Sequence, residues 1–147
     1  MIALLQRVSH ASVEVSGERI ACINRGLLVL LGVEKNDGAE QADKLVHRVL
    51  NYRVFEDEAG KMNLSLGDIQ GEILLVPQFT LAADTKSGMR PGFSTAAPPV
   101  EGEKWFDYAV QKSQESAGSM KVQKGCFGAD MKVSLLNDGP VTFWLQV

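Results

Sequence analysis

The only two histidines of this sequence are poorly placed for catalysis. His47 lies beside Lys44 and Arg48 on a predicted helix, and His10 follows a predicted strand, so both are expected at the surface. Ser-His-Asp and Cys-His mechanisms need a well-positioned histidine. The sequence also lacks the G-x-x-x-x-G-K-[ST], G-x-G-x-x-G, G-x-S-x-G and H-E-x-x-H motifs. ATP, dinucleotide and zinc-protease chemistry are therefore disfavoured, and we expect no metal site and no cofactor.

A short segment, Pro77-Gln78-Phe79-Thr80-Leu81, places polar residues at the end of an apolar run. In a strand, Gln78 and Thr80 would share one face and offer an amide and a hydroxyl to the same pocket. Alternatively, Thr80 is an ordinary β-branched strand residue and Gln78 a satisfied amide at a sheet edge. The residues alone leave both interpretations open.

Two other segments combine glycine and proline with polar residues. NDGPVT, residues 137–142, is typical of a hairpin turn with Pro140 opening the next strand. Because only about 5 to 6% of X-Pro bonds in folded proteins are cis, the sequence alone predicts a trans bond here. TKSGMRPGFS, residues 85–94, is a loop with two cations that faces either solvent or a ligand.

Strands and one helix in the first half of the chain must position these segments. Residues 1–33 predict a strand over MIALLQRV, then SVEVSGERIACI with a turn at Ser16-Gly17, then GLLVLLGV. The last run is apolar enough to be buried on both faces. Residues 39–52 predict a helix with one apolar face, followed by a short hairpin around YRVFED. EILLVPQFTLA, residues 72–82, predicts another buried strand, in which proline must lie at an end or a bulge.

The second half predicts one more helix and three more strands. The helix covers residues 101–117, with Trp105, Ala109 and Lys112 along one side and Gly118 as its stop. The strands are MKVQKGCF, ADMKVSLL and VTFWLQV, and NDGP connects the last two as a turn. This order predicts an α/β fold, a single layered domain of β-sheets covered by two helices that spans residues 1–147.

Composition limits the classes of partner. The chain has 147 residues, 45% of them hydrophobic, and a net charge of -3, so a general polyanion binder is disfavoured and any nucleic acid must be held locally. No signal peptide or membrane-spanning run is recognisable, and we expect a cytoplasmic protein. Cys22 and Cys126 are predicted to be buried free thiols.

The segments PQFTLAADT, GMRPGFS and NDGPVTFWLQV, after an opening MIALLQRV, together resemble the D-aminoacyl-tRNA deacylases, also called D-tyrosyl-tRNA deacylases. The resemblance covers the whole chain. It implies a homodimer with the active site at the subunit interface, and no cofactor. It also implies hydrolysis of the ester that joins a D-amino acid to the 3'-terminal adenosine of tRNA, and deacylation of glycyl-tRNA(Ala) as well.

The resemblance assigns Gly139 and Pro140 to a Gly-cisPro motif that enters the partner's pocket and rejects L-aminoacyl-tRNA, which reverses the trans expectation. Arg7 would help to fix this motif. Gln78, Phe79 and Thr80 would form the catalytic wall, and water activation would fall to the 2'-OH of the tRNA and to backbone groups rather than to the Thr80 hydroxyl. The implied substrate-binding residues are Gly139, Pro140, Arg7, Leu81, Phe127 and Met131.

One position departs from the family pattern, because Pro77 stands where serine is usual. The substitution removes a hydroxyl and a backbone N–H at the start of the catalytic segment. If that serine were essential, the chain would be a noncatalytic module that binds the 3' end of tRNA. A third alternative is a dimeric structural domain without a nucleic-acid role.

Overall fold

The computed structural model describes residues 1–147, and one long first strand organises its sheet. β1 (Ile2–Val15) is continuous where the sequence predicted separate strands. It pairs along its whole length with antiparallel β8 (Met131–Gln146), and register shifts around Val8 let it bend without ending. The predicted break between these strands was wrong. β1 stays continuous across the polar residues at its centre because it pairs there with a strand of similar length.

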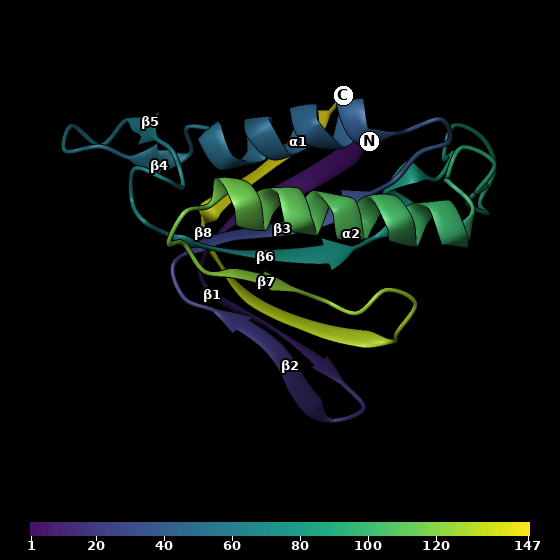
Figure 1. Ribbon diagram of the computed structural model, residues 1–147, viewed down its shortest axis with the longest axis horizontal. Helices are drawn as coiled ribbons and strands as arrows, with labels where there is room; N and C mark the ends of the chain where they lie inside the picture. Colours follow the sequence, from purple (N-terminus) through teal and green to yellow (C-terminus); the bar gives the residue numbers. More distant parts are fainter.

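The remaining strands of the sheet follow the order β2-β1-β3-β6-β7, with β8 also on β1. β2 (Glu18–Ile23) and β3 (Gly26–Gly32) run antiparallel to β1. β6 (Glu72–Pro77) is parallel to β3, and β7 (Val122–Lys124) is parallel to β6. The central position of β3 explains its burial on both faces, as predicted (Figure 1).

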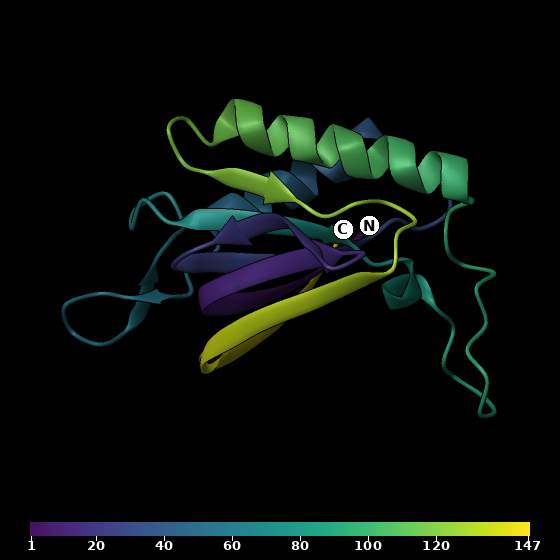
Figure 2. The same cartoon turned by 90° about the horizontal axis from the view of Figure 1, so that it is seen from below.

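Two helices cover one face of this sheet (Figures 1 and 2). α1 (Ala39–Asn51) confirms the predicted apolar face, and its buried residues are Ala42, Leu45, Val46, Val49 and Leu50. α2 (Pro99–Ser116) begins earlier than residue 101, and Gly118 follows its end with φ +60°, as expected of a stop residue. Its buried residues are Gly102, Phe106, Ala109, Val110 and Ser113. Of the side named from the sequence, Ala109 is buried, whereas Trp105 and Lys112 are half-buried.

The opposite face of the sheet is covered by the chain itself. The outer halves of β1 and β8, together with β2, curl beneath β3 and β6 (Figure 2). They enclose a second core cluster, which contains Val8, Ala11, Val13, Ala21, Ile23, Leu28, Leu74 and Val76. The protein is therefore an α/β fold with both helices on one side, as the sequence predicted in outline.

β6 ends at Pro77, and the chain then turns into a 3₁₀ helix, η1 (Phe79–Ala82). The sequence predicted that the strand would continue to residue 82, which was wrong. The ladder between β6 and β7 stops at the bond from the Gly125 N–H to the Leu75 carbonyl, 2.8 Å, because proline has no N–H with which to continue it. Proline at the end of the strand agrees with the prediction.

β8 runs without interruption through the NDGP segment, so this segment is not the predicted hairpin turn. Residues 131–137 pair with the outer half of β1 and residues 142–146 with its inner half. The residues between them form a bend at the shift of register. The turn predicted from Asp-Gly-Pro does not form, because the runs on both sides of it pair with the same strand.

Smaller features complete the fold. The predicted hairpin is present as β4 (Phe55–Glu56) and β5 (Met62–Leu64). Both cysteines are free but exposed, which contradicts the predicted burial. Cys22 alternates with the buried Ala21 and Ile23 along β2 and therefore points outward. None of the helices has the length and apolar character needed to cross a membrane.

Candidate active site

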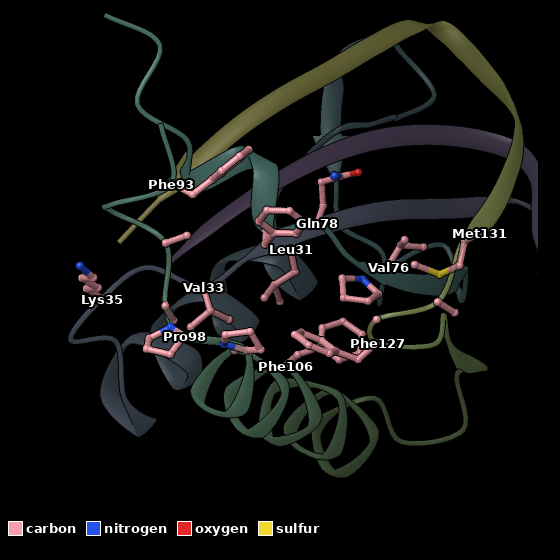
Figure 3. Close-up of a pocket in the computed structure, with 18 of the residues that line it drawn as sticks. Leu31, Val33, Lys35, Val76, Gln78, Phe93, Pro98, Phe106, Phe127 and Met131 are labelled. Carbon is pink, nitrogen blue, oxygen red and sulfur yellow. The ribbon is translucent and has the colours of Figure 1, made fainter. Parts of the chain in front are cut away.

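A cavity of about 800 Å³ opens beyond the ends of β3 and β6, against the first half of α2 (Figure 3). This size is typical of a small-molecule site. Most of its lining is apolar, and it includes five segments that are distant in sequence. They are Leu31 to Lys35, Val76 to Phe79, Phe93 to Pro99, the α2 residues Gly102 and Phe106, and Phe127 to Val133.

Aromatic rings and a glycine form one wall of this cavity, which we call the apolar pocket. The rings of Phe106 and Phe127 lie with their centroids 6.5 Å apart. Gly102 lies beneath Phe127, and a Cβ atom there would be 3.3 Å from the Phe127 ring. The pocket therefore depends on a missing side chain in α2. Phe127 and Met131, two residues singled out from the sequence, both line it.

Pro77 and Met131 meet at the side of the pocket next to β7. A Cβ atom on Gly125 would lie 2.8 Å from the Met131 sulfur and 3.3 Å from the Pro77 Cδ atom. Glycine at position 125 thus lets these two side chains close the wall. Pro77 has neither a side-chain hydroxyl nor an N–H, so it offers no hydrogen-bond donor to this part of the pocket.

Apart from Lys35, the polar side chain of the pocket lining is Gln78, in the turn between β6 and η1. The Gln78 N–H donates to the Leu31 carbonyl at 2.8 Å, and the Gln78 side-chain amide donates to the Thr80 hydroxyl. The first N–H groups of a helix have no acceptor within that helix, which applies to Phe79 and Thr80. Gln78 and Phe79 line the pocket, whereas Thr80 lies just outside its lining.

No base is positioned to activate the Thr80 hydroxyl. Its only side-chain partner is Gln78, and an amide cannot accept a proton at ordinary pH. His10 and His47 are both exposed, and neither lines the pocket. Leu81 does not line the pocket. It packs in a small core cluster with Ile2, Ala82 and the pocket residue Ala96. No group of three His, Cys, Asp or Glu side chains is arranged to hold a metal ion.

The Gly139–Pro140 peptide is cis and lies in the bend of β8, which we call the Gly-Pro corner (residues 137–141). The Arg7 side chain, 7% exposed, fixes this corner from beneath. Its Nε atom donates to the Asp138 carbonyl at 3.0 Å, and its Nη1 atom donates to the Val54 carbonyl at 2.8 Å. The cis geometry differs from the trans bond that the local sequence predicts.

A second set of bonds pins the same corner. The Asn137 amide donates to the carbonyls of Arg7 and Val141, both at 3.0 Å. Gly139 has φ +139°, and a Cβ atom there would lie 2.8 Å from the Val141 nitrogen. Only glycine fits this conformation. The hydrogen bonds hold the corner rigidly, although Gly139 and Pro140 themselves are exposed.

The two regions lie at opposite ends of the subunit. In Figures 1 and 2 the end of β6 and η1 are on the right, whereas the bend of β8 is on the left. No residue of the Gly-Pro corner and no part of Arg7 lines the apolar pocket. The residues singled out from the sequence therefore fall into two separate groups within one chain.

Several pocket residues escaped the sequence analysis. Lys35, Gly102 and Phe106 received no functional interpretation, and Phe93 was noted only within a loop that faces either solvent or a ligand. The structure brings Phe93 to the pocket, with its ring centroid 5.1 Å from that of Phe79. The spacing of Gly102, Phe106 and Ala109 on one helix face was a usable signal for a hollow there.

Comparison with known proteins identifies the family. A sequence model described as D-Tyr-tRNA(Tyr) deacylase matches residues 4–146. The D-aminoacyl-tRNA deacylase of Pseudomonas fluorescens is 63% identical over 146 residues, which are 99% of each chain. The enzyme of the same name from Haemophilus influenzae is 60% identical over 147 residues, covering 100% of both chains.

Two solved structures have the same fold. One, titled c-Myc DNA Unwinding Element Binding Protein, has a TM-score of 0.95 and 41% identity over 100% of this chain and 99% of that one. A probable eukaryotic D-amino acid tRNA deacylase has a TM-score of 0.85 at 17% identity, over 99% of this chain and 98% of that one. The chain therefore belongs to the D-Tyr-tRNA(Tyr) deacylase family of hydrolases.

Proposed function

We propose that this protein hydrolyses the ester bond of D-aminoacyl-tRNA and releases the free D-amino acid and tRNA. The observation that carries the proposal is the 60 to 63% identity, over the full chain, to bacterial proteins named for that activity. The proposal treats residues 1–147 as one deacylase domain and places the reaction in the cytoplasm, where aminoacyl-tRNA is used.

The apolar pocket is the proposed site of the 3'-terminal adenosine. Unpaired bases at the ends of RNA are recognised by stacking on aromatic side chains and by contacts to their edges. Phe127 and Met131 supply an aromatic and a polarisable apolar surface of the required kind, and Gln78 supplies the nearby amide. Leu81 contributes indirectly in this proposal, since it packs η1 against the core.

Hydrolysis is proposed to rely on positioning rather than on a side-chain base. The backbone N–H groups of Phe79 and Thr80 would stabilise the negative charge that develops on the ester carbonyl oxygen. The 2'-OH of the terminal ribose would orient the attacking water. An aminoacyl ester is already labile, so orientation and charge stabilisation together can supply the acceleration. The absence of a base on the Thr80 hydroxyl supports this assignment.

Chiral selection is proposed to come from the Gly-Pro corner of a second subunit. Within one chain the corner lies at the other end from the pocket, so it cannot complete the site of its own subunit (Figure 1). A homodimer would bring the partner's Gly139 and Pro140 to the pocket. Exposed apolar side chains of β8, Leu136 at 53% and Trp144 at 50%, supply surface for such a contact.

The fixed backbone of the corner would reject an L side chain by steric exclusion. Arg7 and Asn137 hold the carbonyls of this segment in place, which is what a discriminating surface requires. Glycine has no side chain to exclude, so glycyl-tRNA(Ala) is proposed as a second substrate. Pro77 removes a hydroxyl and a backbone N–H from the site, and we propose that the chemistry needs neither.

The test is deacylation of matched D-tyrosyl-tRNA and L-tyrosyl-tRNA by the purified protein. We expect rapid loss of the D ester alone, and Thr80→Ala should retain activity within about tenfold, because a general acid or base would contribute roughly a hundredfold or more. Thr80→Ser is the matched control. Hydrolysis of both esters at similar rates would contradict the proposed selection.

The alternative is a module that binds the tRNA 3' end without turnover. Position 77 favours it, since Pro77 lines the pocket and has neither a hydroxyl nor an N–H to donate. Binding of a nonhydrolysable D-aminoacyl adenosine together with no cleavage of D-tyrosyl-tRNA would establish this alternative. In that case Pro77→Ser should create or increase activity.

A further inference from the structure

An aromatic shelf and an unpaired lysine lie together at the mouth of the apolar pocket. Phe93 packs against Phe79 with the ring centroids 5.1 Å apart and the ring planes tilted by 55°, yet the two side chains remain 44% and 54% exposed. Large apolar rings that stay this exposed beside a cavity mark a surface for contact. Lys35 stands on the same side of the opening as Phe93 (Figure 3).

The position of Lys35 is fixed by its backbone. Its N–H donates to the Thr95 carbonyl at 2.9 Å, and the neighbouring Glu34 pairs with Ala96 in an isolated bridge. Lys35 is thereby tied to the loop that carries Phe93. In Figure 3 its amino group lies at the periphery of the lining residues.

No carboxylate neutralises the charge of Lys35. Adjacent Glu34 is engaged by the Met1 amino group and by Gln146. Lys86 and Arg90, on the loop that leads to Phe93, likewise have no ion pair, and Asp84 in that loop accepts the Lys86 backbone N–H. By contrast, the lysines of α1, β7 and β8 each pair with a carboxylate. This edge therefore keeps free positive charge although the protein as a whole is acidic.

We propose that the shelf and Lys35 form a subsite for the nucleotide that precedes the terminal adenosine. The cytosine base would stack on Phe93, and the phosphate that links it to the adenosine would pair with Lys35. Lys86 and Arg90 would face the phosphates further toward the 5' end of the strand. Aromatic platforms next to cations are the usual way in which proteins bind single-stranded nucleic acid. The inference rests on the proposed placement of adenosine in the pocket.

Equilibrium binding of adenosine, AMP and the dinucleotide CpA tests the subsite without any aminoacyl group. Calorimetry should show that CpA binds at least about fivefold more tightly than AMP, the lower end of the effect of one stacked base. Phe93→Ala should bring this CpA-to-AMP ratio close to one. Lys35→Gln should remove the advantage of AMP over adenosine.

Salt dependence provides an independent readout of the phosphate contact. One neutralised phosphate in a single strand predicts a slope of about -0.7 for log affinity against log salt. CpA should show this slope with the wild-type protein, and Lys35→Gln should abolish it. Lys61→Gln is the matched control, because Lys61 is also exposed and free of ion pairs but lies on the turn between β4 and β5.

Equal affinities of the wild-type protein for CpA and AMP, or no binding of CpA, would overturn the subsite. An unchanged CpA-to-AMP ratio in Phe93→Ala would overturn it as well. Failure of the proposed function is a different result, since that would be seen as no cleavage of D-tyrosyl-tRNA. Binding of CpA with the expected ratios would then still establish the subsite.

Discussion

The apolar pocket and the Gly-Pro corner are built on different physical principles. The pocket is a cavity bounded by side chains, and its shape depends on the lack of a side chain at Gly102 and Gly125. The corner is a stretch of backbone fixed by hydrogen bonds from Arg7 and Asn137. Changes in the pocket should therefore alter ligand binding with little effect on stability, whereas changes at the corner should alter stability itself.

The largest expected effect is at Arg7. Arg7→Ala leaves the buried Val54 carbonyl and the Asp138 carbonyl without donors, and each loss costs about 1 to 3 kcal/mol. We expect the free energy of unfolding to fall by roughly 3 kcal/mol or more in urea denaturation. Arg48→Ala is the control, because Arg48 donates to the Gln146 carbonyl from an exposed position. A loss similar to that of the control would mean that the corner is not held by this side chain.

Gly139→Ala should have the next largest effect. The new Cβ atom would meet the Val141 nitrogen at 2.8 Å, at a φ of +139° that L residues rarely adopt. Such strain costs about 1 to 3 kcal/mol, measurable by thermal or urea unfolding. Gly17→Ala is the control for φ alone, since Gly17 has φ +79° and nothing within 4 Å of the added atom.

The same variant sharpens the proposed role of the corner. The ratio of D-tyrosyl-tRNA to L-tyrosyl-tRNA cleavage should fall in Gly139→Ala, because displaced carbonyls no longer exclude the L side chain. The cleavage ratio should be measured at a temperature where the variant remains folded. If the ratio matched that of Gly17→Ala, the corner would have no part in chiral selection.

At the pocket, Gly102→Ala should separate binding from stability. The added Cβ atom would reach to 3.3 Å from the Phe127 ring and narrow the cavity. Alanine in a helix is favoured over glycine by about 1 kcal/mol, so stability should be unchanged or slightly higher. We expect KM for D-tyrosyl-tRNA to rise severalfold. Gln111→Ala, on the same helix but outside the pocket, is the control, and a loss of stability without a change in KM would contradict the distinction.

The smallest expected effect is a pH dependence of stability at Glu34, which lies between the pocket residues Val33 and Lys35. Burial raises the pKa of Glu34, but hydrogen bonds from the Met1 amino group and Gln146 outweigh it, so the net pKa lies below the ordinary 4.5. A lowered carboxyl pKa adds stability above pH 4.5 that is lost as pH falls through the folded-state pKa.

Glu34→Gln tests the contribution of Glu34 to the pH dependence of stability. The variant should lose up to about 1 kcal/mol at pH 7, as expected for a partly exposed ion pair, and the difference from the wild-type protein should shrink toward pH 3. Urea denaturation at both pH values measures it. Glu58→Gln, at an exposed carboxylate without an ion-pair partner, is the control. A difference that grew at low pH would have the wrong sign.

Local sequence patterns predicted the elements that local physics controls. Helical spacing of apolar residues predicted the buried face of α1, and Ser16-Gly17 predicted a turn. The missing N–H of Pro77 predicted a strand end or a bulge there, and β6 ends at Pro77. These features depend on neighbours in the chain or on a residue's own backbone chemistry. Phe127 and Met131, which line the apolar pocket, were singled out only by the resemblance to the family.

Tertiary pairing decided the rest. NDGP is a turn by its local chemistry, but pairing of both flanking runs with β1 makes it a bend within β8, where Arg7 can hold the Asp138 carbonyl. The cis bond, the hollow over Gly102 and the meeting of Phe93 with Phe79 likewise need contacts between distant segments. Sequence determined which residues were available for the site, and long-range packing determined that they form two regions at opposite ends of the subunit.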